Sequence, residues 1–166
     1  QMARTEHEQS LRWQALRVSL GHARTLDGWR LSLRSQGQLA NTALINGDQF
    51  GLGGLTTVRG TLVERPLAGD SGWQGSVELA TPPREGWRLV GFVDAGGIAN
   101  RPGPDGRPGH DLLASAGLGL RWNRPGFAMV LDWGRIIDGS RLSRAELPSA
   151  PKAGDERLYL AVTLVF

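Results

Sequence analysis

Apolar and polar residues alternate along most of this chain with a period of two, as in a β-strand with one apolar side. The clearest stretch is 157–166, where leucine, valine or phenylalanine occupies every second position. Read in this way, the whole sequence predicts no helix and seven strands, at residues 11–20, 29–36, 73–79, 87–94, 112–122, 127–134 and 157–166.

The first of these strands has a break in its alternation. Leu11 and Trp13 occupy one phase, and Leu16 and Val18 occupy the other. A β-bulge near Ala15 reconciles the two halves. A short helix is the competing interpretation.

The connections between the strands alternate in length. Short turns, such as the one at Asp27-Gly28, join the strands in pairs, and long stretches at 39–70, 96–111 and 138–156 join one pair to the next. Transmembrane β-barrels have short periplasmic turns and long outer loops, whereas a soluble sandwich has no reason to sort its connections by length. Four tryptophans also lie at the ends of the apolar rows, where an aromatic girdle would meet the lipid interface: Trp29, Trp73, Trp87 and Trp122.

The predicted fold is therefore all-β, an antiparallel transmembrane β-barrel with its apolar faces outward. Closing a bacterial barrel takes at least about eight strands, so seven strands are too few. We interpret residues 1–166 as one domain that is part of a larger membrane barrel. A soluble β-rich binding domain is the alternative fold.

Composition narrows the possible chemistry. The 166 residues contain no cysteine, so disulfides and thiolate metal sites are excluded, and no apolar run is long enough for a transmembrane helix. The net charge of +3 comes from arginines spread over strands and loops, which argues against a nucleic-acid partner. The glycine-rich stretch lacks the Gly-Lys-Ser/Thr of a phosphate loop.

Catalytic and metal sites are not indicated. Gly69-Asp70-Ser71-Gly72 is similar to the nucleophile segment of trypsin-like proteases, but no histidine lies in a matching segment for the base. The scattered histidines give no zinc motif, and Asp105 and Asp111 do not have calcium-site spacing. The three histidines are His7, His22 and His110. We therefore expect no enzyme activity, no metal and no cofactor.

Three features occur in an order that resembles a known family. A glycine run with Gly51, Gly53 and Gly54 precedes Val58-Arg59-Gly60, a second motif follows at Gly91-Phe92-Val93-Asp94-Ala95-Gly96, and the chain ends in Phe166. Together they resemble the outer-membrane transporters of two-partner secretion, the haemolysin-activator family of the Omp85 superfamily. The resemblance covers Trp29 to Phe166.

The resemblance implies a location and partners. It implies that residues 1–166 are the C-terminal part, about seven strands, of a sixteen-stranded barrel in the bacterial outer membrane, in contact with its lipid. It also implies N-terminal polypeptide-transport-associated (POTRA) domains upstream of this chain. The implied function is secretion of a largely unfolded partner exoprotein, such as a haemolysin or adhesin. Phe166 is the implied signal to the barrel-assembly machinery. An insertase that assembles other barrels, also of the Omp85 superfamily, is the alternative function.

The resemblance also implies that the loop at 39–70 folds into the barrel, where Arg59 pairs with Asp94. The alternation supports an inward Asp94, because Asp94 shares the phase of Arg88 and Phe92. A guanidinium is the best bidentate partner for such a carboxylate, although a solvated arginine in a turn is the alternative. Thr61 stands where the family has an aromatic residue. The residues expected to face the lumen are Arg30, Arg34, Glu78, Arg88, Phe92, Arg121 and Asp132.

Overall fold

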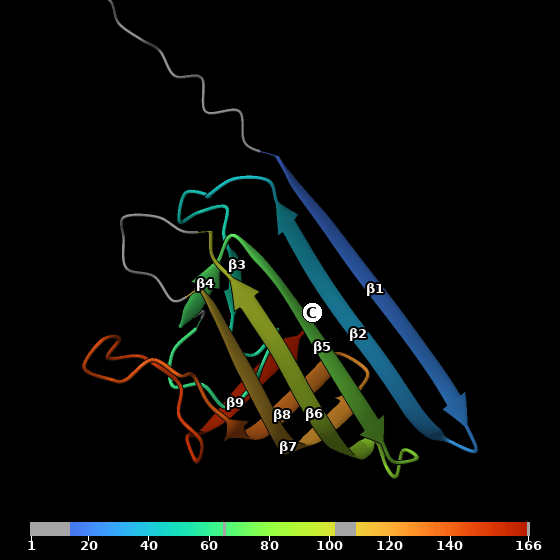
Figure 1. The fold of residues 1–166 in the computed structure, drawn as a ribbon. Helices are drawn as coiled ribbons and strands as arrows, with labels where there is room; N and C mark the ends of the chain where they lie inside the picture. Colours follow the sequence, from blue (N-terminus) through green and yellow to red (C-terminus); the bar gives the residue numbers. More distant parts are fainter. Residues whose placement is uncertain (1–13, 65, 102–108, 166) are drawn as a thin grey trace, which may run out of the picture.

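The computed structural model describes residues 14–64, 66–101 and 109–165. They form a seven-stranded antiparallel sheet and a separate two-stranded ribbon (Figure 1). The all-β prediction is confirmed, and the pairing order of the sheet is β1-β2-β5-β6-β7-β8-β9. The sheet strands are β1 (Ala15–Leu26), β2 (Trp29–Ala40), β5 (Ser71–Ala80), β6 (Trp87–Ala99), β7 (His110–Arg124), β8 (Phe127–Asp138) and β9 (Glu156–Leu164); the ribbon is β3 (Phe50–Leu52) and β4 (Leu67–Gly69).

The first strand lies further along the chain than its sequence pattern predicts. β1 pairs with β2 without a register shift from Ala15 to Leu26, so these described residues contain neither the predicted bulge nor the short helix. Residues 11–13 lie outside the described part. The pattern stopped at Leu20 because His22 and Arg24 occupy the apolar phase, yet backbone pairing with β2 continues past them. A register shift occurs instead between Ala114 and Ser115 of β7.

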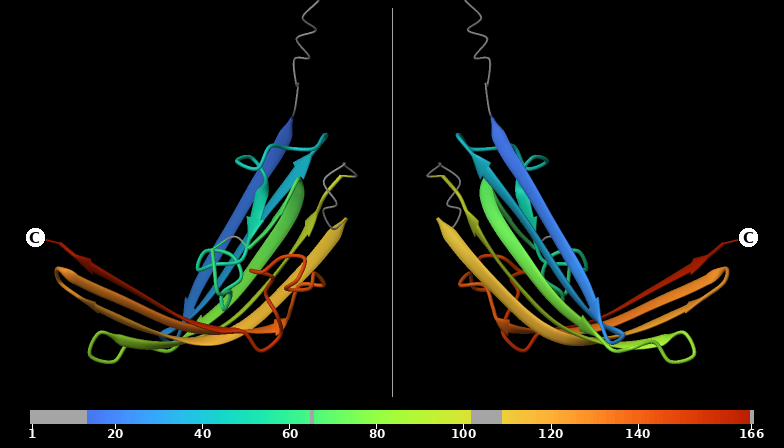
Figure 2. Two further views of the ribbon diagram at one scale, coloured as in Figure 1. Left: turned by 90° about the vertical axis from the view of Figure 1, so that its left-hand side faces the viewer. Right: turned by 90° about the vertical axis from the view of Figure 1, so that its right-hand side faces the viewer.

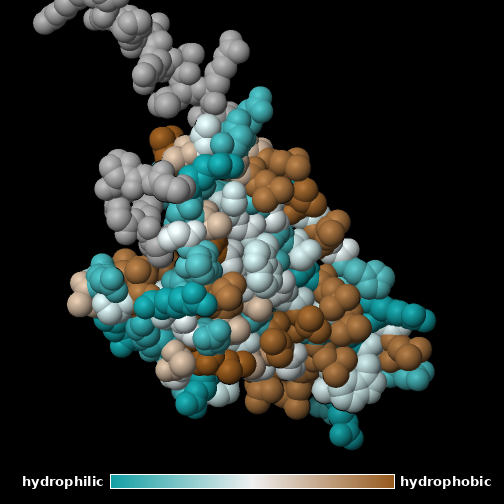
Figure 3. Space-filling view, viewed as in Figure 1, coloured by the Kyte–Doolittle hydropathy of each residue, from teal (hydrophilic) through white to brown (hydrophobic). Residues whose placement is uncertain are grey.

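Each strand of the sheet has an apolar face and a more polar face, and the apolar faces lie together. Figure 2 shows the sheet curved into a trough, with the β3–β4 ribbon and its loop on the concave side. Figure 3 views the convex side, where apolar side chains gather along the strands. The exposed apolar residues of this side include Leu20, Leu33, Val77, Val93, Leu118, Trp133 and Leu160.

The buried apolar cluster lies on the concave side, under the ribbon. Leu52 and Leu67 of the ribbon and Val58 of its loop pack against inward residues of β6, β7 and β8, namely Ile98, Leu113 and Ile136. Apolar burial is the main attraction between packed elements. The cluster therefore fixes the ribbon, and with it loop residues 53–64, against the wall.

Aromatic side chains mark the short-turn end of the sheet. Trp87 and Trp122 are opposite residues of β6 and β7, and their rings stack with centroids 4.8 Å apart. Trp29 begins β2 at the same end, whereas Trp73 lies near the long-loop end of β5. This distribution is typical of aromatic belts at two interfaces. Among the described residues, no helix has the length and hydropathy needed to cross a membrane.

Candidate functional site

The loop between β3 and β4 carries Val58-Arg59-Gly60 to the concave face of the sheet. Its start is shaped by Gly53, whose φ of +104° is in the region that favours glycine. The backbone N–H of Gly54 donates to the carbonyl of Val58 at 3.1 Å, which closes a tight turn, and the Val58 side chain is fully buried. The turn and the buried valine aim Arg59 at the wall.

The tip of the loop lies directly against the backbone of β8. Gly60 has a φ of +105°, and a Cβ placed on it would lie 3.1 Å from the carbonyl carbon of Gly134. A Cβ on Gly134 would in turn lie 3.0 Å from the backbone nitrogen of Gly60. Two glycines therefore permit this approach, one on the loop and one on the strand.

The guanidinium of Arg59 makes a bidentate ion pair with Asp94 of β6. Its Nε and Nη2 each donate to one carboxylate oxygen at 2.7 Å, and its backbone N–H donates to Asp94 Oδ2 at 3.1 Å. Arg59 is 2% exposed and Asp94 is not exposed at all. The structure thus brings together the two residues that the sequence paired, with three hydrogen bonds to one carboxylate.

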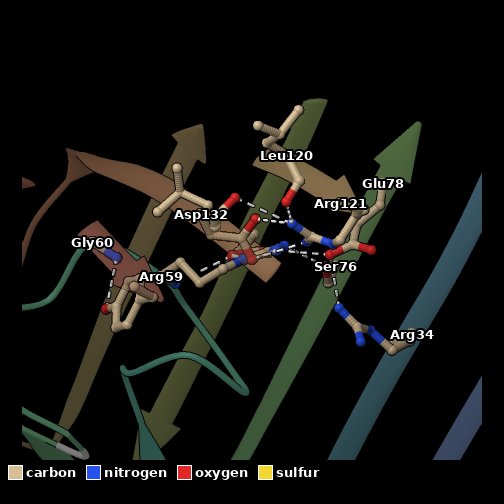
Figure 4. Close-up of polar contacts among 11 residues, drawn as sticks. Arg34, Arg59, Gly60, Ser76, Glu78, Leu120, Arg121 and Asp132 are labelled. Atoms are coloured by element: carbon tan, nitrogen blue, oxygen red, sulfur yellow. Dashed lines mark hydrogen bonds and ion pairs between the residues drawn. The ribbon is translucent and has the colours of Figure 1, made fainter. Parts of the chain in front are cut away.

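Two further carboxylates and a hydroxyl also bind Arg59 (Figure 4). Its Nη1 donates to Glu78 of β5 at 2.7 Å and to Asp132 of β8 at 3.3 Å, and its Nη2 donates to Ser76 Oγ at 3.2 Å. One loop arginine is therefore bound to three strands of the wall. The sequence placed Glu78 and Asp132 on the inward face but did not assign them to Arg59.

The carboxylates also link Arg59 to two wall arginines. Glu78 accepts from Arg34 of β2 at 2.9 Å, and Asp132 accepts from Nη2 of Arg121 of β7 at 3.0 Å. Gly119 leaves room for the second of these pairs, because a Cβ there would overlap both side chains. Arg30 and Arg88 share the concave face but are not among the contacts of Arg59.

Phe92 covers one face of the guanidinium. The Arg59 Cζ atom lies 3.4 Å from the centre of the Phe92 ring, a cation–π contact. Burial on this loop opposes the charge of Arg59, but the hydrogen bonds and charges of Asp94 and Glu78 outweigh it, and the pKa of Arg59 is raised above its usual range. The side chain therefore stays cationic inside the site.

Two residues of β9 also hold the loop, and neither was predicted from the sequence to do so. The Tyr159 hydroxyl accepts from the N–H of Gly60 at 3.2 Å and donates to the carbonyl of Thr61 at 3.3 Å. Arg157 donates to the carbonyls of Thr61 and Leu62. The available signal was their shared inward phase in β9. Thr61, which replaces the expected aromatic, is fully buried.

The remaining predicted positions have simpler roles. Ser71 Oγ accepts a hydrogen bond from the N–H of Ala40 at 3.0 Å, and Asp111 accepts hydrogen bonds from Ser140 and from the Arg141 N–H. In the described ranges, no group of three potential ligands could hold a metal ion. Phe166 and Asp105 lie outside the described residues.

Removing the hydroxyl of Tyr159 should loosen the loop tip without releasing it. We expect Tyr159→Phe to weaken seating of the loop by about 1 kcal/mol, because the Gly60 N–H and the Thr61 carbonyl lose a buried partner. Hydrogen exchange of the Gly60 amide in the full-length protein measures the effect. Thr163→Val, an exposed change on the same strand, is the control. Unchanged Gly60 exchange in Tyr159→Phe would contradict the predicted role.

The fold matches that of a solved protein. The structure of CdiB from Acinetobacter baumannii aligns with a TM-score of 0.65 over 92% of this chain, at 23% sequence identity. The chain spans 27% of the length of that CdiB chain. No curated protein sequence matches the chain.

A family model decides the relationship. The model for the haemolysin secretion/activation protein ShlB/FhaC/HecB matches residues 1–122, which is most of the chain. Its matched segment includes the loop with Arg59 and the strand with Asp94. The chain therefore belongs to the ShlB/FhaC/HecB family of outer-membrane, two-partner secretion β-barrels.

Proposed function

We propose that this chain forms part of the wall of a transporter that secretes a largely unfolded partner exoprotein across the outer membrane. The observation that carries the proposal is the seating of Arg59 among Asp94, Glu78 and Asp132 on the concave face. A loop bound in this way would occupy the lumen of the complete barrel. Its release or retention would then decide how much of the lumen is open to a polypeptide.

The two faces of the sheet suit this role. The convex face exposes leucine, valine and tryptophan, which suits contact with lipid. The concave face carries arginines, carboxylates, serines and glutamines, which offers an unfolded chain no large apolar surface on which to stall. No nucleotide is needed in this proposal, since binding and folding of the client outside can give direction.

We further propose how the chain contributes to the complete protein. Residues 1–166 would supply seven strands of a sixteen-stranded barrel, with the loop at 39–70 on the outer side folding inward. POTRA domains upstream would receive the client. The last strand, ending in Phe166, would be read by the barrel-assembly machinery.

Deletion of the full-length gene and complementation test the proposal. We expect the partner exoprotein to disappear from the medium in the deletion strain and to return with the wild-type gene, while other outer-membrane barrels keep their levels. A fall in the levels of unrelated barrels would favour the insertase alternative. Secretion that persists in the deletion strain would refute the transport function.

A further inference from the structure

The concave face has more positive than negative charge near its short-turn end. A pocket of about 690 Å³ there is lined by four arginines, and Glu78 is its acidic lining residue; the arginines are Arg30, Arg34, Arg88 and Arg121. Arg34 and Arg121 also line the neighbouring pocket that contains Arg59. The two pockets therefore meet at the arginines that share carboxylates with Arg59.

The carboxylates of this region are already paired with arginines. Asp94 is occupied by Arg59, Glu78 is shared by Arg59 and Arg34, and Asp132 is shared by Arg59 and Arg121. Five arginines thus face three carboxylates, and the excess is two positive charges. Among the ion pairs of the described residues, none involves Arg30 or Arg88.

Arg88 has a buried donor atom, Nη1, that lacks a hydrogen-bond partner among the described residues. Its Cα partner across the β6–β7 ladder is Arg121, and like charges directly opposite each other destabilise a sheet. A buried donor on a cation without an acceptor is costly, so this geometry suits an anion that binds beside Arg88 on the concave face.

The spacing of the arginines indicates the kind of anion. Arg30 and Arg34 are four residues apart on one face of β2, so their Cα atoms are about 13 Å apart along the strand. Arg88 and Arg121 lie on other strands of the same wall. Carboxylates distributed along an extended peptide match arginines spread over the wall in this way better than a single small anion does.

We propose that this arginine cluster binds acidic segments of the unfolded polypeptide that passes through the lumen. The inference rests on the proposed transport function and names the chemistry of its substrate. The Arg34 side chain is 58% exposed, so its contact with an acidic segment is weak and reversible. Weak contacts of this kind hold an acidic segment near the loop without trapping it.

Peptide binding to the full-length protein in detergent tests the inference without any transport. The probe is a fluorescein-labelled peptide of four Glu-Gly-Ser-Gly repeats, and its match has glutamine in place of every glutamate. We expect the acidic peptide to bind about tenfold more tightly at low ionic strength, the effect of two exposed ion pairs of ordinary strength. High salt should remove the difference, because exposed charges are screened.

Variants locate the site. Arg30→Gln with Arg88→Gln should reduce binding of the acidic peptide to that of the glutamine peptide. The matched control, Arg24→Gln with Arg84→Gln, removes the same charge from the outward phase of β1 and from an exposed turn, and should bind like wild type. Heat-modifiable gel mobility shows that each variant is a folded barrel.

Two results of the peptide-binding experiment would overturn the inference, and a third separates it from the transport function. Equal binding of the two peptides to the wild-type protein overturns the inference and requires no variant. Displacement of the peptide by micromolar inorganic phosphate overturns it in favour of a small-anion site. If the exoprotein is still secreted in a deletion strain while the acidic peptide binds as expected, the transport function fails and the arginine site remains.

Discussion

Asp94→Asn is expected to reduce secretion of the exoprotein at least tenfold while the barrel still inserts. The substitution keeps the shape of the side chain but removes the charge that binds Arg59 through three hydrogen bonds. Breaking a buried ion pair from one side costs about 3–5 kcal/mol, and water in the lumen lowers that value. Glu78 and Asp132 remain, so Arg59 stays cationic but loses its bidentate partner. Immunoblots of the culture medium measure secretion.

The position of the loop can be followed separately. The described chain has no cysteine and Leu62 is exposed beside the motif, so Leu62→Cys is a reporter for a membrane-impermeant thiol reagent. We expect faster labelling in the Asp94→Asn background. Asp138→Asn, at the exposed end of β8, is the matched control and should change neither labelling nor secretion. Normal secretion by Asp94→Asn would show that the pair has no part in transport.

A charge swap between Arg59 and Asp94 should fail to restore secretion. An isolated pair of opposite charges would tolerate the exchange. Here an aspartate at position 59 would bring a third carboxylate toward Glu78 and Asp132, and like charges repel. In the wild-type protein, one carboxylate oxygen of each lies 2.7 Å and 3.3 Å, respectively, from Nη1 of Arg59. The site is therefore built for a cation from the loop, and the sequence, which identified only one of its three carboxylates as a partner, could not show this.

The sequence predicted the strands because each one has two chemically different faces. The same periodicity put Asp94, Glu78 and Asp132 inward, and it placed Arg30, Arg34 and Arg88 with them. Lateral order and register depend on backbone pairing between strands, so the alternation could not show which inward residues meet. The alternation also did not predict that β1 extends past His22, because that part of the strand is held by backbone pairing with β2.

The ribbon and the contacts of β9 were not predictable from pattern. β3 and β4 are three residues each, too short for a period to be recognised, and they pair across a gap of fourteen residues. Tyr159 lies about a hundred positions from Gly60 in the chain, and only the curvature of the sheet brings them together. Long-range contacts of a loop are set by where its ends are anchored, and here the buried cluster around Leu52 and Leu67 does this.

Gly134→Val is expected to displace the loop and reduce secretion as strongly as Asp94→Asn, although it removes no charge. The Cβ alone would lie 3.0 Å from the carbonyl carbon of Arg59 and from the nitrogen of Gly60, and the two methyl groups add further overlap. Overpacking against backbone costs about 1–3 kcal/mol, because neither the strand nor the loop tip can move aside easily. Arg59 would then be lifted away from Asp94.

The comparison with Gly91→Val separates this effect from a general intolerance of valine in the wall. Gly91 lies on β6 with nothing within 4 Å of the position a Cβ would take, so the added side chain projects into open space on the apolar face. We expect Gly91→Val to insert into the membrane, to support secretion and to show the parent's rate of thiol labelling at the Leu62→Cys reporter. Gly134→Val should insert, but its reporter should be labelled faster. If Gly134→Val secretes normally while its loop reporter labels faster, seating of the loop on the wall is dispensable for transport. If neither property changes, the close approach of Gly60 to β8 does not determine where the loop lies.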